Sequence, residues 1–194
     1  MTHILVIKLG GSLSVSQALS DALNQIAKRR GRTVIVPGGG NFANQVRFAQ
    51  QQWQFNDVIA HEMSILAMQQ MALLFKGLQS DFNLASTLTE IQQYLTSSAP
   101  KPIIWSPSIH ELNNAGIAAS WEITSDSLAA WLATQLTAKT LILVKSATVF
   151  SSNLKKLSEH GIIDAAFAGF VAHADFTVYI LNKDHFHELS EFNE

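Results

Sequence analysis

Short runs of consecutive aliphatic residues alternate along the chain with longer segments in which apolar residues recur at helical spacing. The aliphatic runs occupy residues 4–7, 33–36, 103–105, 140–144 and 177–181. Such runs are typical of strands buried on both faces. The amphipathic segments predict helices over residues 15–26, 41–52, 57–77, 124–136, 162–174 and 184–192, and Thr87 with Glu90 predicts a further short helix by the spacing of a capping box. This alternation indicates an α/β fold in which a parallel, or mostly parallel, sheet carries helices on both faces.

Nothing along the sequence divides it into parts. The 194 residues contain no internal repeat, low-complexity segment or linker, and we expect one α/β domain over residues 1–194. Hydrophobic residues make up 47% of the chain and charged residues 14%, whereas about a quarter of the residues of a typical soluble protein are charged. This composition, with the methionine- and leucine-rich segment 57–77, predicts that a second subunit covers apolar surface, as in a homodimer or larger assembly.

The composition also excludes several classes of protein. Lys and Arg number 13 and Asp and Glu 15, a net charge of −2, and the one basic cluster (Lys28, Arg29, Arg30 and Arg32) is expected to end a helix. Nucleic acid is therefore not an expected partner. The absence of cysteine excludes disulfides, thiolate catalysis and cysteine-ligated metals. The apolar stretches are shorter than a membrane span of about 20 residues, and the first residues do not form a signal peptide, so we expect a cytoplasmic protein without a membrane partner.

Two glycine-rich loops follow the first two predicted strands. Ligands of open α/β sheets bind at the carboxyl ends of strands, where glycines let backbone N–H groups approach a ligand and a following helix offers a positive N-terminus. The first loop contains Lys8, Gly10, Gly11 and Ser12, and its lysine can place an ammonium group on a bound phosphate. Alone, this loop is equally compatible with a tight turn beside a snorkelling lysine.

The second loop, Pro37-Gly38-Gly39-Gly40-Asn41, repeats the arrangement. Ordered glycines are costly in conformational entropy, and two such loops after two buried strands favour an anion site. Neither loop is a Walker A sequence or a G-x-G-x-x-G fingerprint. A standard P-loop nucleotidase and a dinucleotide-dependent dehydrogenase are therefore disfavoured.

Further polar and aromatic residues lie near the other strand ends. Asp126 falls in the first turn of a predicted helix, where it either caps that helix or holds Lys8 in place between the loops. Lys145 follows an aliphatic run and either faces the ligand cleft or is an ordinary solvated strand end. Trp105 and Trp121 precede the same helix, and their rings either stack on a flat acceptor or belong to the core or a subunit interface.

Four runs of residues form a joint pattern: Lys8-Leu9-Gly10-Gly11-Ser12, Val36-Pro37-Gly38-Gly39-Gly40, Thr124-Ser125-Asp126-Ser127-Leu128-Ala129-Ala130 and Leu141-Ile142-Leu143-Val144-Lys145. In order and approximate spacing this pattern resembles the amino acid kinase superfamily, which includes aspartokinase, acetylglutamate kinase and uridylate kinase. The run from Trp121 to Ser127 and the ending from Gly161 to Phe167 resemble the small branch that acts in methanofuran biosynthesis. Kinases of that branch extend an aminomethylfuran-methyl phosphate to a diphosphate.

The resemblance implies a three-layer αβα sandwich, often dimeric, and a kinase that uses ATP with Mg²⁺ carried by the nucleotide rather than by protein ligands. It implies that Lys8 stabilises the transferring phosphoryl group and that Asp126 organises Lys8 and Lys145. It also implies two sets of binding residues: Gly10, Gly11, Ser12, Ser146 and Thr148 for ATP, and Gly38, Gly39, Gly40, Asn41, Trp121, Thr124 and Ser125 for the acceptor.

One stretch departs from the family pattern. Where the family usually carries Asp-x-Asp-Gly, in the loop at the base and ribose of the nucleotide, this chain has Ser146-Ala147-Thr148-Val149. Two hypotheses therefore stand. The chain is a kinase for a phosphate or carboxylate group of a small furan-type precursor of methanofuran or methylofuran, which needs no general base because the acceptor is already an anion. Alternatively, it is a catalytically degenerate member of this fold that acts as a binding or scaffold subunit.

Overall fold

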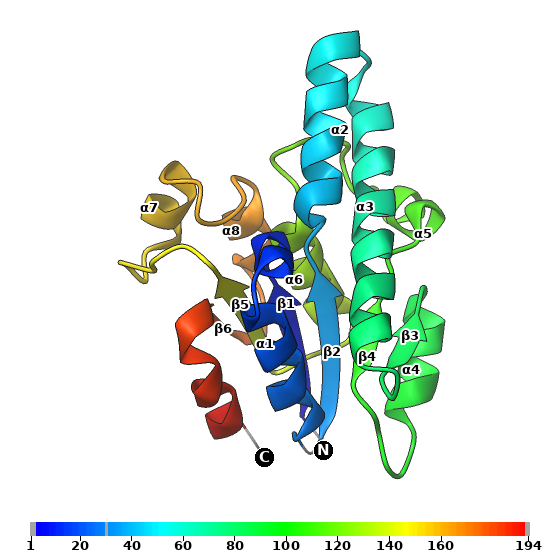
Figure 1. The fold of residues 1–194 in the computed structure, drawn as a ribbon, viewed down its shortest axis with the longest axis vertical. Coiled ribbons are helices and arrows are strands. Elements are labelled where there is room, and N and C mark those ends of the chain that lie inside the picture. Colours follow the sequence, from blue (N-terminus) through cyan, green and yellow to red (C-terminus); the bar gives the residue numbers. More distant parts are fainter. Residues whose placement is uncertain (1–2, 30, 193–194) are drawn as a thin grey trace.

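The computed structural model describes residues 3–29 and 31–192. Its strands form one six-stranded sheet in the order β3-β4-β2-β1-β5-β6, and every neighbouring pair is parallel (Figure 1). The strands are β1 (Ile4–Leu9), β2 (Arg32–Pro37), β3 (Asn83–Ala85), β4 (Ile103–Trp105), β5 (Thr140–Lys145) and β6 (Thr177–Asn182). Because all strands run the same way, the loops after β1, β2 and β5 leave the sheet at one edge.

The sheet is buried on both of its faces. Successive residues of the central strands point to opposite faces: Val6, Val34 and Leu141 belong to one hydrophobic cluster, and Ile7 and Ile35 belong to a second one. This double burial explains why the strands are uninterrupted apolar runs. It confirms the predicted three-layer αβα arrangement.

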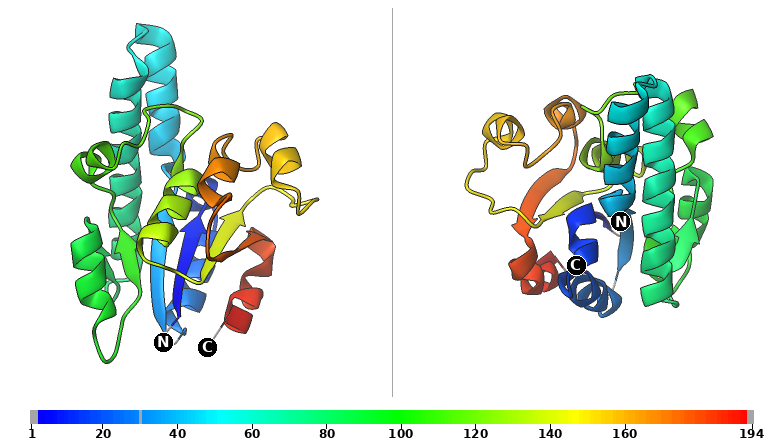
Figure 2. Two further views of the ribbon diagram at one scale, coloured as in Figure 1. Left: turned by 180° about the vertical axis from the view of Figure 1, so that it is seen from behind. Right: turned by 45° about the horizontal axis from the view of Figure 1, so that its top comes forward.

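A different set of helices covers each face of the sheet. The helical elements are η1 (Gly11–Val15), α1 (Ala18–Ala27), α2 (Gly40–Trp53), α3 (Asp57–Leu78), α4 (Leu88–Leu95), α5 (Ile109–Asn114), α6 (Ser125–Gln135), α7 (Leu154–Glu159), α8 (Phe167–Val171) and η2 (Lys183–Phe192). α1 and η2 pack on one face, together with the end of α3, and α6 packs on the other face with α4 and α8 (Figure 2).

The helices α2 and α3 form a long antiparallel hairpin that extends beyond the edge of the sheet where the strands end (Figure 1). Gln54 ends α2 in the left-handed conformation, and the side chain of Asn56 caps α3 by accepting a hydrogen bond from Ile59 N. The expectation that all apolar stretches are shorter than a membrane span is wrong for α3, which by length and composition would suffice to cross a membrane. Of its most apolar stretch, 44% is buried inside the protein, where Ile65, Met71 and others join the core. One side of α3 thus belongs to the core, while Leu66 and Leu73 are exposed.

One predicted helix is wrong in extent and another in type. In place of a helix over 162–174, residues before α8 form a turn in which Gly161 has a positive φ and Asp164 bonds to a distant part of the chain. The last element, η2, is a 3₁₀ segment with a kink at His185 rather than a regular helix. The short elements β3, α5 and α7 were not predicted, because three to six residues carry too little periodicity to be recognised.

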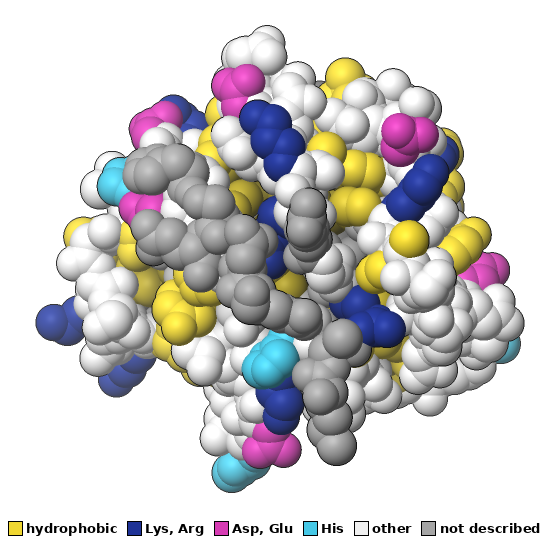
Figure 3. Space-filling model, turned by 90° about the horizontal axis from the view of Figure 1, so that it is seen from below, with side chains coloured by type: hydrophobic (Ala, Val, Ile, Leu, Met, Phe, Trp, Pro, Cys, Tyr) yellow, Lys and Arg dark blue, Asp and Glu magenta, His cyan; other side chains and the backbone are white. Residues whose placement is uncertain are grey.

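The basic cluster serves internal contacts. Arg29 donates hydrogen bonds to the carbonyl oxygens of Leu189 and Phe192, and Arg32 donates to that of Leu95; Arg30 lies outside the described residues. Figure 3 views the end of the molecule that carries the chain termini, and among the side chains coloured there both signs of charge are scattered without a broad basic face.

Candidate active site

Two lysines flank one buried aspartate at the carboxyl edge of the sheet. Lys8 Nζ lies 2.8 Å from Asp126 Oδ1, and Lys145 Nζ donates a hydrogen bond to Asp126 Oδ2. Lys8 is 4% exposed, Asp126 2% and Lys145 9%. β1 and β5 pair in parallel and place the two lysines on adjacent strand ends, while the first turn of α6 brings the carboxylate between them. The predicted ion pairing of Asp126 with the lysines is confirmed.

The three groups carry one net positive charge in a nearly dry environment. Burial alone would raise the pKa of Asp126, but the two adjacent ammonium groups outweigh burial and lower it below its usual range. Burial, and then the like charge of Lys8, lower the pKa of Lys145 to about 8, although Asp126 and Asp164 oppose this shift. Because buried ion pairs seldom stabilise a fold relative to apolar residues, two lysines on one carboxylate are more typical of a functional site.

The two glycine loops pack directly on each other beside this ion cluster. The loop after β1 is tied to β5 by a hydrogen bond from Gly10 N to Val144 O, and the loop after β2 is tied to β1 by one from Gly38 N to Leu9 O. A Cβ atom at Gly11 would lie 2.2 Å from Gly40 N, and one at Gly38 would lie 2.5 Å from Gly11 N. The close approach of two backbones therefore requires glycine at both positions.

The residues predicted to bind ATP lie around the end of β5. Ser12 Oγ and Ser146 Oγ are 2.8 Å apart and share a hydrogen bond, which joins the first glycine loop to the loop after β5. Thr148 is exposed in that second loop. The helix predicted over residues 15–26 is confirmed as α1, but it begins only at Ala18, and residues 11–15 form the 3₁₀ turn η1. The α-helix N-terminus that meets this loop is that of α2, which begins at Gly40 and packs against Gly11.

Asp164 is a site residue that the sequence reasoning missed. One of its carboxylate oxygens accepts hydrogen bonds from the backbone N–H groups of Thr124 and Ser127, both at 2.9 Å, and the other accepts from the Thr124 hydroxyl. Thr124 makes no side-chain cap of its own. Asp164 thus caps α6 from another part of the chain and holds the turn that carries Asp126. The two donors of Thr124 are already engaged by this contact.

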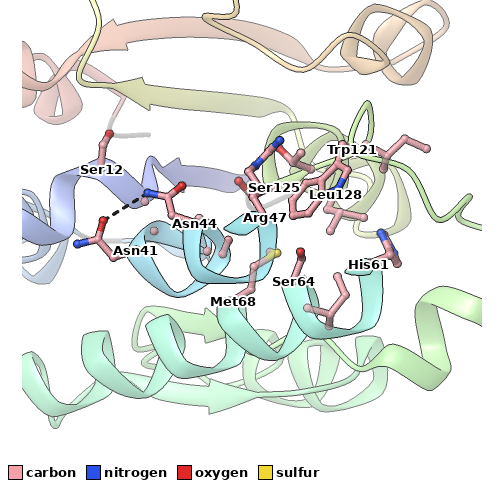
Figure 4. A pocket seen from close by; sticks show the side chains of 18 of the residues that line it. Ser12, Asn41, Asn44, Arg47, His61, Ser64, Met68, Trp121, Ser125 and Leu128 are labelled. Atoms are coloured by element: carbon pink, nitrogen blue, oxygen red, sulfur yellow. Dashed lines mark hydrogen bonds between the residues drawn. The ribbon is translucent and has the colours of Figure 1, made fainter. Parts of the chain in front are cut away.

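A cavity of about 310 Å³ opens on the other side of the glycine loops (Figure 4). All of the residues predicted to bind the acceptor line it: Gly38, Gly39, Gly40, Asn41, Trp121, Thr124 and Ser125. Gly11 and Ser12 reach it as well, whereas Lys8 and Lys145 are not among its lining residues. The α2–α3 hairpin forms one wall, so the cavity begins at the glycine loops and runs along the hairpin.

The tryptophans separate into one cavity residue and one core residue. Trp121 lines the cavity, with the Arg47 guanidinium carbon 3.8 Å from the centroid of its ring and its indole N–H donating to Gln50 Oε1 at 2.7 Å. Trp105 is fully buried and packs near Trp131. The aromatic-acceptor hypothesis therefore retains Trp121 and loses Trp105.

No group of three His, Asp or Glu side chains is arranged to hold a metal ion in the described part of the chain.

A comparison with protein families matches the amino acid kinase family over residues 3–165. The chain belongs to the amino acid kinase family. The matched region includes both glycine loops, Asp126, both lysines and Asp164, and it confirms the resemblance drawn from the sequence.

Comparison with individual family members adds a relative in sequence and two in structure. The chain is 29% identical over 146 residues to (5-(aminomethyl)furan-3-yl)methyl phosphate kinase of Methanocaldococcus jannaschii, which covers 71% of this chain but 63% of that relative. The match thus spans less than two thirds of the relative's length. Uridylate kinase from Archaeoglobus fulgidus superposes with a TM-score of 0.71 at 14% identity, covering 98% of this chain and 96% of that one. UMP kinase from Ureaplasma parvum gives 0.71 at 15%, covering 100% and 97%. At these identities the likeness shows the amino acid kinase fold.

Proposed function

We propose that this protein is an ATP-dependent kinase that transfers a phosphoryl group to an anionic group of a small acceptor. The observation that carries the proposal is the pair of buried lysines on one aspartate beside two interlocked glycine loops. Their net positive charge fits a transferring phosphoryl group, whose negative charge would otherwise be costly in such a buried site.

The chain's own residues would act by positioning and by neutralising charge. ATP supplies the phosphoryl group, with Mg²⁺ bound to its phosphates. Lys8 and Lys145 hold ammonium groups at the strand ends, and Asp126 fixes both without cancelling their combined charge. Phosphoryl transfer of this kind relies on placement and electrostatics rather than on covalent chemistry by the protein. An acceptor that is already an anion needs no general base.

The acceptor we propose is a phosphate on a small aromatic ring, of the furan type used in methanofuran or methylofuran biosynthesis. Two observations support it. The cavity beside the glycine loops carries Trp121 and the guanidinium of Arg47, an aromatic platform and a cation. The 29% identical relative is named a kinase for an aminomethylfuran methyl phosphate.

The alternative, a degenerate binding or scaffold subunit, is favoured by one observation. The loop after β5 holds Ser146 and Thr148 in place of the family's two acids, and both residues are exposed. Nucleotide binding separates the two hypotheses. At one hundred times its Kd, ATP with Mg²⁺ should stabilise the protein by about 2.7 kcal/mol and raise its Tm. An unchanged Tm at millimolar ATP would contradict the kinase and favour the scaffold.

A further inference from the structure

The end of the cavity far from the glycine loops carries polar groups that phosphoryl transfer does not use. In Figure 4, Ser12 and Asn41 lie at one end of the cavity, and His61 and Trp121 lie at the other. His61 stands one helical turn after Asp57 on α3, and both residues line the cavity. The far end therefore presents one carboxylate and one imidazole, beside the Arg47 guanidinium that lies over the Trp121 ring.

His61 is buried and incompletely bonded. It is 7% exposed, and its Nε2 has no hydrogen-bond partner among the described residues. Burial lowers the pKa of His61, and the charge of Glu62 only partly opposes that effect, so the ring is neutral at neutral pH. A neutral imidazole has one nitrogen that accepts a hydrogen bond. A buried polar atom without a partner is unfavourable, and a bound ligand would relieve it.

Asp57 is held at the cavity by a chain of hydrogen bonds. Its Oδ1 accepts from Gln50 Nε2 at 2.8 Å, and Gln50 Oε1 accepts from the indole N–H of Trp121 at 2.7 Å. Asp57 takes part in none of the ion pairs found among the described residues. An acid in the first turn also suits the helix dipole, but that role alone does not require a link through Gln50 to the cavity wall.

The distance between the two ends sets the size of the ligand. Gly40 and Gln50 are ten residues apart on α2, which corresponds to about 15 Å along the helix axis. Because Gln50 contacts Asp57, the carboxylate lies about that far along the hairpin from the glycine loops. The cavity is thus long enough for a ring with one substituent at the loops and another that reaches α3.

We propose that Asp57 and His61 form a subsite for a primary ammonium group of the acceptor, at the end opposite the group that is phosphorylated. This inference rests on the proposed function. An ammonium group offers three donors and no acceptor, and it matches a carboxylate beside a neutral imidazole nitrogen. A second phosphate or carboxylate there would meet the negative charge of Asp57.

The test measures binding in the absence of nucleotide. The full chain is titrated calorimetrically with (5-(aminomethyl)furan-3-yl)methyl phosphate and with the analogue in which a hydroxyl replaces the amine. The wild type should bind the amine about tenfold more tightly, because a hydrogen-bonded charge pair contributes that much. Asp57→Asn and His61→Phe should lose most of this preference through weaker binding of the amine alone. Asp21→Asn, which changes an exposed acid in the first turn of α1, is the matched control and should keep the preference.

The outcomes separate this inference from the proposed function. A wild type that binds both compounds equally, or neither, would overturn the subsite, as would an Asp57→Asn variant that weakens both equally. If the wild type prefers the amine but transfers no phosphoryl group from ATP to it, the kinase proposal fails and the subsite stands. If the wild type transfers the group without preferring the amine, the subsite fails and the kinase proposal stands.

Discussion

Asp164 accepts a hydrogen bond from the backbone N–H of Thr124 at 2.9 Å, although 40 residues separate the two along the chain. The same carboxylate also engages Ser127 N and the Thr124 hydroxyl. These contacts fix the first turn of α6, which carries Asp126 between the two lysines. A residue outside the ion cluster thus determines where the central carboxylate lies.

Removing this cap should cost both stability and turnover. Asp164→Ala leaves two backbone donors without a partner, so we expect a destabilisation of about 1–3 kcal/mol and a fall in kcat that exceeds any rise in the KM of either substrate. Asp164→Asn keeps a side-chain oxygen acceptor, so its stability and its kcat should lie between those of Asp164→Ala and the wild type. Thermal unfolding and steady-state kinetics check this, with the exposed Asp175→Ala as a control. Unchanged Tm and kcat in Asp164→Ala would show that the contact does not position the site.

The lowered pKa of Lys145 predicts that activity falls at alkaline pH. Its pKa is lowered to about 8, chiefly by burial, so its ammonium group is charged below that pH and loses its proton as the pH rises through it. If this charge stabilises the transferring phosphoryl group, kcat/KM should fall about tenfold per pH unit above about 8. In Lys145→Arg the guanidinium stays charged, so the alkaline fall in kcat/KM should move to higher pH. The same alkaline limb in both proteins would assign it to another group.

The contact between the glycine loops predicts a difference between two glycine-to-alanine substitutions. Gly11→Ala places a Cβ atom 2.2 Å from Gly40 N, which should destabilise the protein by about 1–3 kcal/mol and disturb the site. At Gly77, near the end of α3, a Cβ atom meets nothing within 4 Å, and Gly77→Ala should be neutral or stabilise by up to about 1 kcal/mol. Thermal unfolding of the two variants measures the contrast, and equal effects would refute it.

Much of the fold follows from the sequence because the sheet is buried on both faces. That burial makes β1, β2 and β5 continuous aliphatic runs, which are recognisable without any partner. The short strand β3 has no such run, and α7 has only six residues. The segment before α8 was predicted as helix since its apolar spacing fits one, but the side chain of Asp164 is bonded to α6 instead.

The candidate site was partly predictable for a similar reason. Lys8 and Lys145 end buried strands, and strand ends of a parallel sheet meet at one edge, so their proximity follows from the pattern. Asp164, His61 and Arg47 were not predicted as site residues, because each acquires its role from contacts between segments far apart in sequence. The one available signal for Asp164 was its position in the run from Gly161 to Phe167, which resembles the small kinase branch.

Exposed apolar side chains on the α2–α3 hairpin predict a homodimer, as the low charged fraction does. Phe48, Trp53, Leu66 and Leu73 are between 46% and 72% exposed, whereas monomers seldom expose large contiguous apolar surface. We expect a second copy of the chain to pack on this hairpin and sedimentation to show a dimer at micromolar concentration. Leu73→Glu should weaken it, and Phe150→Glu, in the loop after β5 and 54% exposed, should not. A wild-type monomer would contradict the prediction.

The most direct measurement of the central claim is phosphoryl transfer itself, followed by ³¹P NMR with ATP, Mg²⁺ and (5-(aminomethyl)furan-3-yl)methyl phosphate. The wild type should convert the monophosphate to a diphosphate with release of ADP. Lys8→Ala should fold but turn over orders of magnitude more slowly, because an ammonium group at the reacting phosphoryl is lost, while the exposed Lys139→Ala should stay active. No diphosphate from the wild type, or near-normal kcat in Lys8→Ala, would contradict it.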